Sequence, residues 1–252
     1  MTQLQQRPPF GRRPRQTDVE NPAPRYRRAQ WIGAALILAL LSALAAMLVR
    51  AGGQEAPAAP APDGAVVAPA DSGRGVRVGD TSAPVTASLY FDYLCPACGA
   101  FEAVNGDELT RLLEEGVVAL ELRPMAFLDH LSGGTRYSTR ALGAMATVAD
   151  GAPDQVWAFH RALYAAQPAE GGPGLTDGEI AAIAIDVGVP QDVVERFGDA
   201  TYEPWTVAMT DRAFDDGVEG TPTILLEGQV FEGDWSAPGV LTDAILQAAG
   251  DH

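Results

Sequence analysis

Two cysteines separated by two residues carry the most specific chemical signal in this 252-residue sequence. They are the only cysteines of the chain and lie in the run Cys95-Pro96-Ala97-Cys98. Proline is typical of the first turn of a helix, so Cys95 is expected at a helix N-terminus, where unpaired N–H groups and the helix dipole stabilise a thiolate. Cys98 comes one turn later and is expected to face the packing surface of the helix. The spacing therefore predicts thiol–disulfide exchange in which Cys95 attacks and Cys98 resolves the mixed disulfide.

Three other interpretations of the cysteine pair compete with redox chemistry: a structural disulfide, a zinc site and two inert buried thiols. A disulfide that closes so short a loop stabilises a protein by less than about 2 kcal/mol. Zinc usually requires a second cysteine pair or a histidine pair. The histidines are each expected to be surface or capping residues, because no ligand spacing relates His130, His160 and His252. The position of Pro96 argues against inert thiols, so redox chemistry is favoured, with no metal and no organic cofactor.

Asp92, three residues before Cys95, has two open roles. A partly buried carboxylate at this place could carry protons to or from Cys98. The same side chain could instead cap the turn that precedes the helix. The residue types alone leave both the proton relay and the turn cap open.

The helices and strands that must position the cysteines can be predicted from residue types and from the glycines and prolines that begin or end them. The run 85–93 (VTASLYFDY) is rich in β-branched and aromatic residues and predicts a buried strand. A helix is expected from Pro96 to about residue 115, where Gly116 ends it. The run 117–123 (VVALELR) alternates and predicts a second strand. These elements place Cys95 at a strand-to-helix junction.

The second half of the chain predicts several helices followed by a strand hairpin. Two short strands, 222–227 and 229–232, are separated by Gly228. The order of elements predicts an α/β sheet with an inserted helical subdomain at about 135–216. The expected helices are 138–149, 154–166, one capped by Thr176 and Glu179, one opened by Pro190, 205–214, and a last one near 240–249.

A run of 19 residues without a charge, 31–49, divides the chain. A helix of that length spans about 28 Å, close to the thickness of a bilayer core. Seven arginines precede the run and only Arg50 follows it closely, so the positive-inside rule predicts a cytoplasmic N-terminus with the rest of the chain outside. A cleaved signal peptide is the alternative, because residues 43–45 (ALA) resemble a cleavage site, although they lie inside the apolar run.

Composition assigns the remaining segments. Residues 1–30 are rich in Arg and Pro and predict a disordered cytoplasmic tail, and residues 50–75 are rich in Ala, Pro and Gly and predict an extended linker. Residues 76–252 are long enough for one buried core. The chain has 33 acidic and 17 basic residues, a net charge of -16. Such an acidic protein would repel phosphate, so nucleic-acid binding by the folded part is not expected.

Two sequence motifs resemble the DsbA-like branch of the thioredoxin superfamily of thiol-disulfide oxidoreductases. The first is FDYLCPACGAFE, which contains both cysteines, and the second is VEGTPTILLEG, which contains Pro222. The resemblance covers about residues 76–250, and the run 137–142 (YSTRAL) is similar to membrane-tethered members. It implies a thioredoxin fold with a helical insertion, here preceded by the single transmembrane helix expected at 31–49.

The resemblance also implies roles for individual residues. Pro222 is expected to be cis and to face the two sulfurs, with the backbone of Thr221 beside them. Substrate would pair with that backbone as an added strand. It further implies that Cys95 attacks and Cys98 resolves. The residues expected to contact substrate are Thr221, Pro96 and Ala97.

Two departures from the best-known DsbA pattern bear on the direction of exchange. The dipeptide between the cysteines, Pro96-Ala97, supplies neither a charge nor a side-chain donor, where that branch has a histidine. Thr221 stands where strong oxidases commonly have Val. We therefore expect a Cys95 thiolate that is less stabilised, and a reduction potential that is less oxidising, than in the strongest oxidants.

The sequence thus predicts a membrane-tethered oxidoreductase that works outside the cytoplasm. It is expected to exchange disulfides with unfolded or reduced exported proteins, chiefly as an oxidant, and the resemblance implies reoxidation by a quinone-linked membrane partner. A reductase or isomerase is the alternative within the class. A redox-inactive binding or metal-delivery module of the same fold is the alternative outside it.

Overall fold

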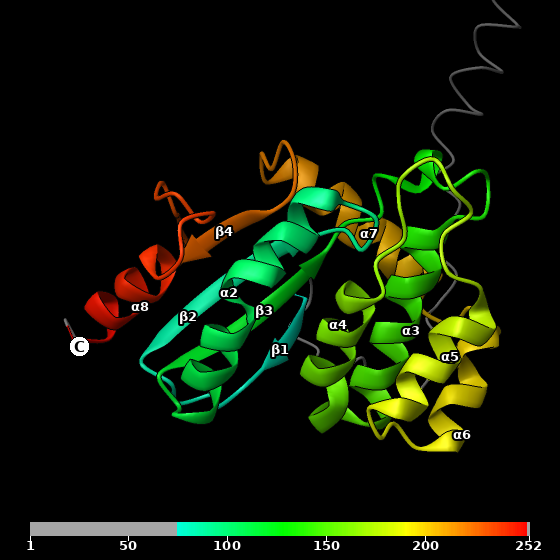
Figure 1. The fold of residues 1–252 in the computed structure, drawn as a ribbon, viewed down its shortest axis with the longest axis horizontal. Coiled ribbons are helices and arrows are strands. Elements are labelled where there is room, and N and C mark those ends of the chain that lie inside the picture. The colour runs from blue at the N-terminus through cyan, green and yellow to red at the C-terminus, as the bar shows by residue number, and fades with distance from the viewer. Residues whose placement is uncertain (1–74, 251–252) are drawn as a thin grey trace, which may run out of the picture. The chain divides into compact units, whose positions relative to one another are not determined.

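The computed structural model describes residues 75–250. The expected tail, the apolar run 31–49 and the linker up to residue 74 lie outside the described residues. Among residues 75–250, no helix combines the length and the apolar character needed to cross a bilayer. The described part is an α/β unit in which helix α2 (Pro96–Glu114) lies across a twisted sheet and a group of helices packs at one side (Figure 1).

The sheet has five strands in the order β1-β3-β2-β4-β5. Strands β2 (Val85–Phe91) and β3 (Val118–Pro124) run parallel, and β4 (Thr223–Leu226) is antiparallel to β2. Strands β1 (Val76–Val78) and β5 (Gln229–Val230) form the two antiparallel edges. The carboxyl ends of β2 and β3 and the beginning of β4 therefore lie at the same end of the sheet.

Helix α2 begins at Pro96 because the proline ring fits the first helical turn, where no N–H is needed. Its buried face includes Cys98, Phe101, Leu109 and Leu112, which recur at helical spacing. Helix α2 ends before Gly116, whose φ of 68° is favourable for glycine. This face turns Cys98 toward the sheet and leaves Cys95 at the helix tip.

The chain between β3 and β4 forms the helical region, which confirms the expected insertion. The capping box is confirmed as well, since the Thr176 hydroxyl accepts a hydrogen bond from the Glu179 N–H at 3.2 Å and the Glu179 carboxylate accepts from the Thr176 N–H at 2.8 Å. The helices of this region are α3 (Tyr137–Gly151), α4 (Val156–Ala165), α5 (Asp177–Asp186), α6 (Gln191–Val194) and α7 (Glu203–Asp215). Helix α8 (Val240–Gly250) ends the described chain.

Three elements differ from the sequence-based expectation. Strand β1 was not expected, because three residues are too few to show a period. The first expected strand ends at Phe91, and residues 92–94 form the turn that leads to Cys95. Strand β3 was expected to alternate, but all of its residues except Arg123 are buried, because α2 and α7 both pack against it.

One hydrophobic core joins the sheet to the helical region. Its largest fully buried side chains come from both parts, and include Phe91 and Tyr93 at and just beyond the end of β2, and Leu142, Met145 and Phe159 on α3 and α4. Each such side chain contributes about 1.5–3 kcal/mol when it is fully buried. The helical region is therefore packed onto the sheet at the strand end that leads to the cysteines.

Candidate active site

The two sequence motifs meet at one end of the sheet. The turn after β2 delivers Cys95, and the segment before β4 delivers Thr221 and Pro222. The Cys95 Sγ atom lies 3.4 Å from the carbonyl oxygen of Thr221. The Thr221–Pro222 peptide bond is cis, as the family resemblance implies. The structure therefore brings together the residues that the resemblance singled out.

Cys95 is the N-cap of α2 and carries the more acidic of the two thiols. The hydrogen bond from the Cys98 thiol is the main cause that lowers the pKa of Cys95, to about 6. The Thr221 hydroxyl and the backbone N–H groups of Ala97 and Cys98 act in the same direction, and burial opposes them. Cys95 is 7% exposed as a residue, compared with 2% for Cys98. At neutral pH the Cys95 sulfur is mostly a thiolate, which is the nucleophilic form.

Cys98 has the opposite character. Its side chain is 2% exposed, and burial raises the pKa of its thiol far above the ordinary value, with the neighbouring Cys95 sulfur adding to the increase. Both cysteines are free thiols in this structure. The reduced pair therefore consists of one ionised and one protonated sulfur.

The dipeptide between the cysteines contributes through its backbone. Pro96 is exposed and Ala97 is half-buried. The Ala97 N–H helps to lower the pKa of Cys95, but neither side chain carries a donor or a charge. The pKa of about 6 fits the expectation of a thiolate less stabilised than in the strongest oxidants, for which about 3.5 is known.

Asp92 is fully buried and holds three segments together. Its carboxyl oxygens accept hydrogen bonds from the Leu94 N–H at 2.9 Å, the Leu128 N–H at 3.0 Å and the Ser138 hydroxyl at 2.6 Å. Burial raises the pKa of Asp92 to about 7, against the lowering effect of these three donors. The bond to Leu94 is the turn cap that the sequence left open, whereas the proton relay stays a prediction.

His160 corrects a sequence-based expectation. It was expected at the surface or in a cap, but it is completely buried in the core. Its Nδ1 atom lies 3.1 Å from the Tyr93 hydroxyl, and its Nε2 atom lies 3.8 Å from Glu102. Burial lowers the pKa of His160 to about 3, so the ring is neutral at physiological pH. Aromatic side chains of α4 and β2 surround the His160 ring. The burial of His160 could not be predicted from the usual exposure of histidine in proteins.

Sequence reasoning missed the polar groups of the helical region that reach the active-site turn. They are Ser138 on α3, Tyr164 on α4 and Gln167 just beyond α4. Each lies more than 40 positions from its partner in the turn. No local pattern marks such residues, and only the packing of α3 and α4 on the sheet reveals them.

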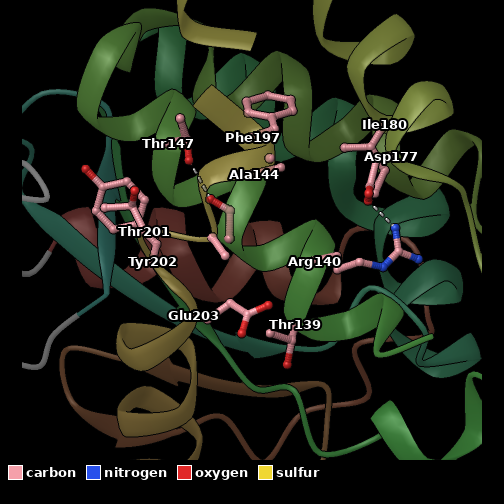
Figure 2. A pocket seen from close by; sticks show the side chains of 13 residues that line it. Thr139, Arg140, Ala144, Thr147, Asp177, Ile180, Phe197, Thr201, Tyr202 and Glu203 are labelled. Carbon is pink, nitrogen blue, oxygen red and sulfur yellow. Dashed lines mark hydrogen bonds and ion pairs between the residues drawn. The ribbon is translucent and has the colours of Figure 1, made fainter. Parts of the chain in front are cut away.

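A separate pocket of about 120 Å³ lies among the helices of the helical region, and none of its lining residues belongs to the cysteine motif or to the Thr221–Pro222 segment. Figure 2 shows Arg140 and Asp177 joined across its wall by an ion pair of 2.5 Å. The Arg140 guanidinium also donates to the carbonyl oxygens of Thr135 and Leu175. Because the Arg140 guanidinium is already bound to Asp177 and to these two carbonyls, we assign no catalytic role to this pocket.

Comparison with known proteins identifies the family. The sequence profile of the thioredoxin family matches residues 71–242. The reduced disulfide bond oxidoreductase DsbG of Mycobacterium tuberculosis is 30% identical, with a TM-score of 0.63 over 71% of this chain and 89% of that one. Reduced DsbA of the same organism is 29% identical, with a TM-score of 0.62 over 71% of this chain and 94% of that one. MdbA of Actinomyces oris, a thiol-disulfide oxidoreductase, is 27% identical, with a TM-score of 0.56 over 66% and 80% of the two chains.

A curated relative shares only part of its length with this chain. The serine/threonine-protein kinase PknE of Mycobacterium tuberculosis is 33% identical over 118 residues, which are 45% of this chain and 21% of the kinase. The match thus spans about a fifth of the kinase. Taken with the paired cysteines beside a cis proline, the family match and the solved relatives show that this chain belongs to the thioredoxin family and is a DsbA-like protein thiol-disulfide oxidoreductase.

Proposed function

We propose that this oxidoreductase is tethered to the cell membrane, faces outward and acts chiefly as an oxidant of exported proteins. The observation that carries the direction is the lowered pKa of the Cys95 thiol at the tip of α2. A thiolate stabilised at Cys95 favours the reduced form of the pair. A protein whose reduced form is stabilised gives its disulfide away readily.

The proposed reaction starts from the Cys95–Cys98 disulfide. A substrate thiolate attacks Cys95 Sγ, the Cys95–Cys98 bond breaks, and Cys98 leaves with the electron pair and takes up a proton. A mixed disulfide now joins the substrate to Cys95. The second substrate thiolate attacks the substrate sulfur of this bond, which forms the substrate disulfide and releases Cys95 as a thiolate. Two electrons have passed from the substrate to the cysteine pair.

The substrate is proposed to lie along the Thr221 backbone. The segment before β4 runs beside Cys95, and an extended peptide can pair with such a segment as an added strand. Pro96 and Ala97 flank the attacking sulfur at the helix tip and would form the other wall of the site. Recognition through backbone groups and small apolar side chains fits substrates that are unfolded and varied in sequence.

The tether and the compartment rest on the amino-acid sequence. The uncharged run 31–49, with seven arginines before it, supports a single-pass anchor in the lipid bilayer with the catalytic domain outside the cytoplasm. A quinone-linked membrane protein is proposed to reoxidise the cysteine pair. The membrane anchor and the outward orientation are tested by fractionation of cells that express the full chain, combined with protease treatment of intact cells. Recovery of the uncleaved catalytic domain in the soluble cytoplasmic fraction would refute them.

The direction of exchange is tested with the full-length protein in detergent. We expect the oxidised protein to accelerate disulfide formation in a reduced, unfolded substrate, and the redox equilibrium with glutathione to favour the reduced cysteine pair. The matched control is Cys95→Ser, which keeps the size of the side chain and removes the nucleophile. A potential as reducing as that of thioredoxin, about -270 mV, would instead support the reductase alternative. Equal activity of the wild type and Cys95→Ser would support a redox-inactive binding module.

A further inference from the structure

Gln167 reaches the active-site turn from the helical region. Its Nε2 atom lies 3.0 Å from the carbonyl oxygen of Tyr93 and 2.8 Å from the carbonyl oxygen of Cys95. Both partners are acceptors only, so the group that faces them must be the NH₂ end of the amide, with one N–H for each carbonyl. A single side chain therefore ties together the two carbonyls that flank Leu94.

Gly99 makes room for this side chain on α2. A Cβ atom at Gly99 would lie 2.2 Å from the Gln167 Oε1 atom, which is far closer than van der Waals contact permits. Glycine in a helix costs about 0.5–1 kcal/mol relative to alanine. The Gln167 amide thus occupies the space that a side chain at position 99 would need, which explains the glycine there.

The carbonyl that Gln167 holds belongs to the residue that determines how α2 begins. Cys95 is the N-cap, and no side chain caps the helix at this end. The Cys95 carbonyl also accepts the N–H groups of Cys98 at 3.1 Å and Gly99 at 3.2 Å. The Ala97 and Cys98 N–H groups help to lower the pKa of the Cys95 thiol. The orientation of the Cys95 peptide group, from which this first turn starts, therefore affects the environment of the nucleophile.

The helical region binds the same turn at a neighbouring point. The Tyr164 hydroxyl, at the end of α4, donates to the carbonyl oxygen of Asp92 at 3.2 Å. Tyr164 and Gln167 together bind three of the four backbone carbonyls from Asp92 to Cys95. The turn is therefore held from outside the sheet rather than by its own side chains alone.

We propose that Gln167 is a positioning residue for the attacking cysteine: its amide fixes the Cys95 peptide group so that the first turn of α2 presents its N–H groups to the Cys95 sulfur. This inference rests on the proposed exchange at Cys95 and adds a residue that the cysteine motif does not contain. The effect is transmitted through the backbone, so Gln167 needs no contact with substrate.

The first test replaces Gln167 by methionine, which keeps the length of the side chain and removes both donors. We expect the pKa of the Cys95 thiol to rise and the glutathione equilibrium constant to shift by about three- to tenfold toward the disulfide form of the pair. The matched control is Gln191→Met on α6, whose exposed amide donates to the Glu195 carboxylate just beyond that helix and is not part of the active-site turn. Gln167→Asn, whose shorter amide can reach one carbonyl at most, should give an intermediate value.

The second test displaces the amide without removing it. Gly99→Ala should raise the pKa of Cys95 in the wild type, because its methyl group pushes the Gln167 side chain away. In a Gln167→Ala background the same methyl group meets no obstacle, so Gly99→Ala should leave the pKa unchanged. Circular dichroism of each variant establishes that it is folded.

The outcomes separate this inference from the proposed function. An unchanged pKa and an unchanged equilibrium constant in folded Gln167→Met, or an equal effect of Gly99→Ala with and without Gln167, would overturn the positioning role. Absence of disulfide exchange in the wild type would overturn the proposed function instead, while the pKa measurements would still decide the role of Gln167. A shift confined to Gln167 and Gly99 variants would support the inference.

Discussion

The carbonyl oxygen of Thr221 and the Cys95 sulfur lie 3.4 Å apart although 126 positions separate the two residues in the chain. A carbonyl can only accept, so only the protonated form of Cys95 donates this hydrogen bond. When Cys95 ionises, the Thr221 carbonyl loses its donor and is free to accept a substrate N–H. Ionisation of the nucleophile and availability of the substrate-pairing backbone are therefore linked at this point.

The Thr221 hydroxyl provides a first prediction. Its oxygen is buried and makes no hydrogen bond of ordinary geometry, yet it helps to lower the pKa of both cysteines. Thr221→Val, which is close in shape, should raise the pKa of Cys95 and make the protein a weaker oxidant. The pH dependence of alkylation of Cys95 measures the pKa. A fall in the pKa would instead support the sequence-based view that Thr at this position weakens the oxidant.

Cys98 provides a second prediction, because its thiol is the main cause of the acidity of Cys95. Cys98→Ala should raise the pKa of Cys95 from about 6 toward its ordinary value, whereas Cys98→Ser, which keeps an O–H donor, should raise it less. Alkylation rates of Cys95 across the pH range measure both. Identical pKa values in the alanine and serine variants would show that the thiol donor is not responsible.

Asp92 provides a prediction about stability and pH. Because burial raises its pKa to about 7, its contribution to stability is complete below the unfolded-state value of about 4 and is lost as the pH rises through about 7. Asp92→Asn should remove this decline and also destabilise the protein by about 1–3 kcal/mol, since the amide NH₂ group would face the Leu128 N–H, to which Asp92 Oδ2 now offers an acceptor. Urea unfolding over this pH range measures both effects, and an unchanged decline in the variant would contradict the assignment.

The same variant tests the proton relay. If the Asp92 carboxyl takes the proton from or gives it to Cys98, Asp92→Asn should change the pH dependence of the exchange rate near pH 7, where this carboxyl titrates. Stopped-flow measurement of mixed-disulfide resolution gives the profile. A rate that is uniformly lower at every pH would point to the turn cap alone.

His160 gives the opposite dependence on pH. Its pKa is lowered to about 3, so the ring must gain a proton on unfolding, and stability is lost as the pH falls from about 6.5 toward 3. His160→Gln can still bond the Tyr93 hydroxyl but does not titrate, so its unfolding free energy should fall less steeply below about pH 6. Urea unfolding of His160→Gln and of Asp92→Asn separates the pH-dependent contributions of His160 and Asp92 to the unfolding free energy. If the unfolding free energy of His160→Gln fell with decreasing pH as steeply as that of the wild type, the His160 contribution would be refuted.

The sequence was sufficient for the residues whose function is local. Cys95 and Cys98 were assigned from their spacing and from Pro96, and the cis Pro222 from the family resemblance. Residues that act through tertiary packing could not be assigned: Gln167, Ser138 and the buried His160 meet the active-site turn only after α3 and α4 are packed onto the sheet. Strand β1 was missed for a different reason, since its three residues pair with β3 without any periodic pattern of their own.

The bonds from Ser138, Tyr164 and Gln167 to the turn before Cys95 have a consequence for engineering. Excising the helices between β3 and β4 to obtain a miniature enzyme would leave the Asp92 carboxyl without Ser138 and would expose the rings at the end of β2. A shortened protein would have to keep α3 and α4, together with α5 and α6, whose buried side chains Ile180, Ala184, Val193 and Val194 belong to the same hydrophobic core.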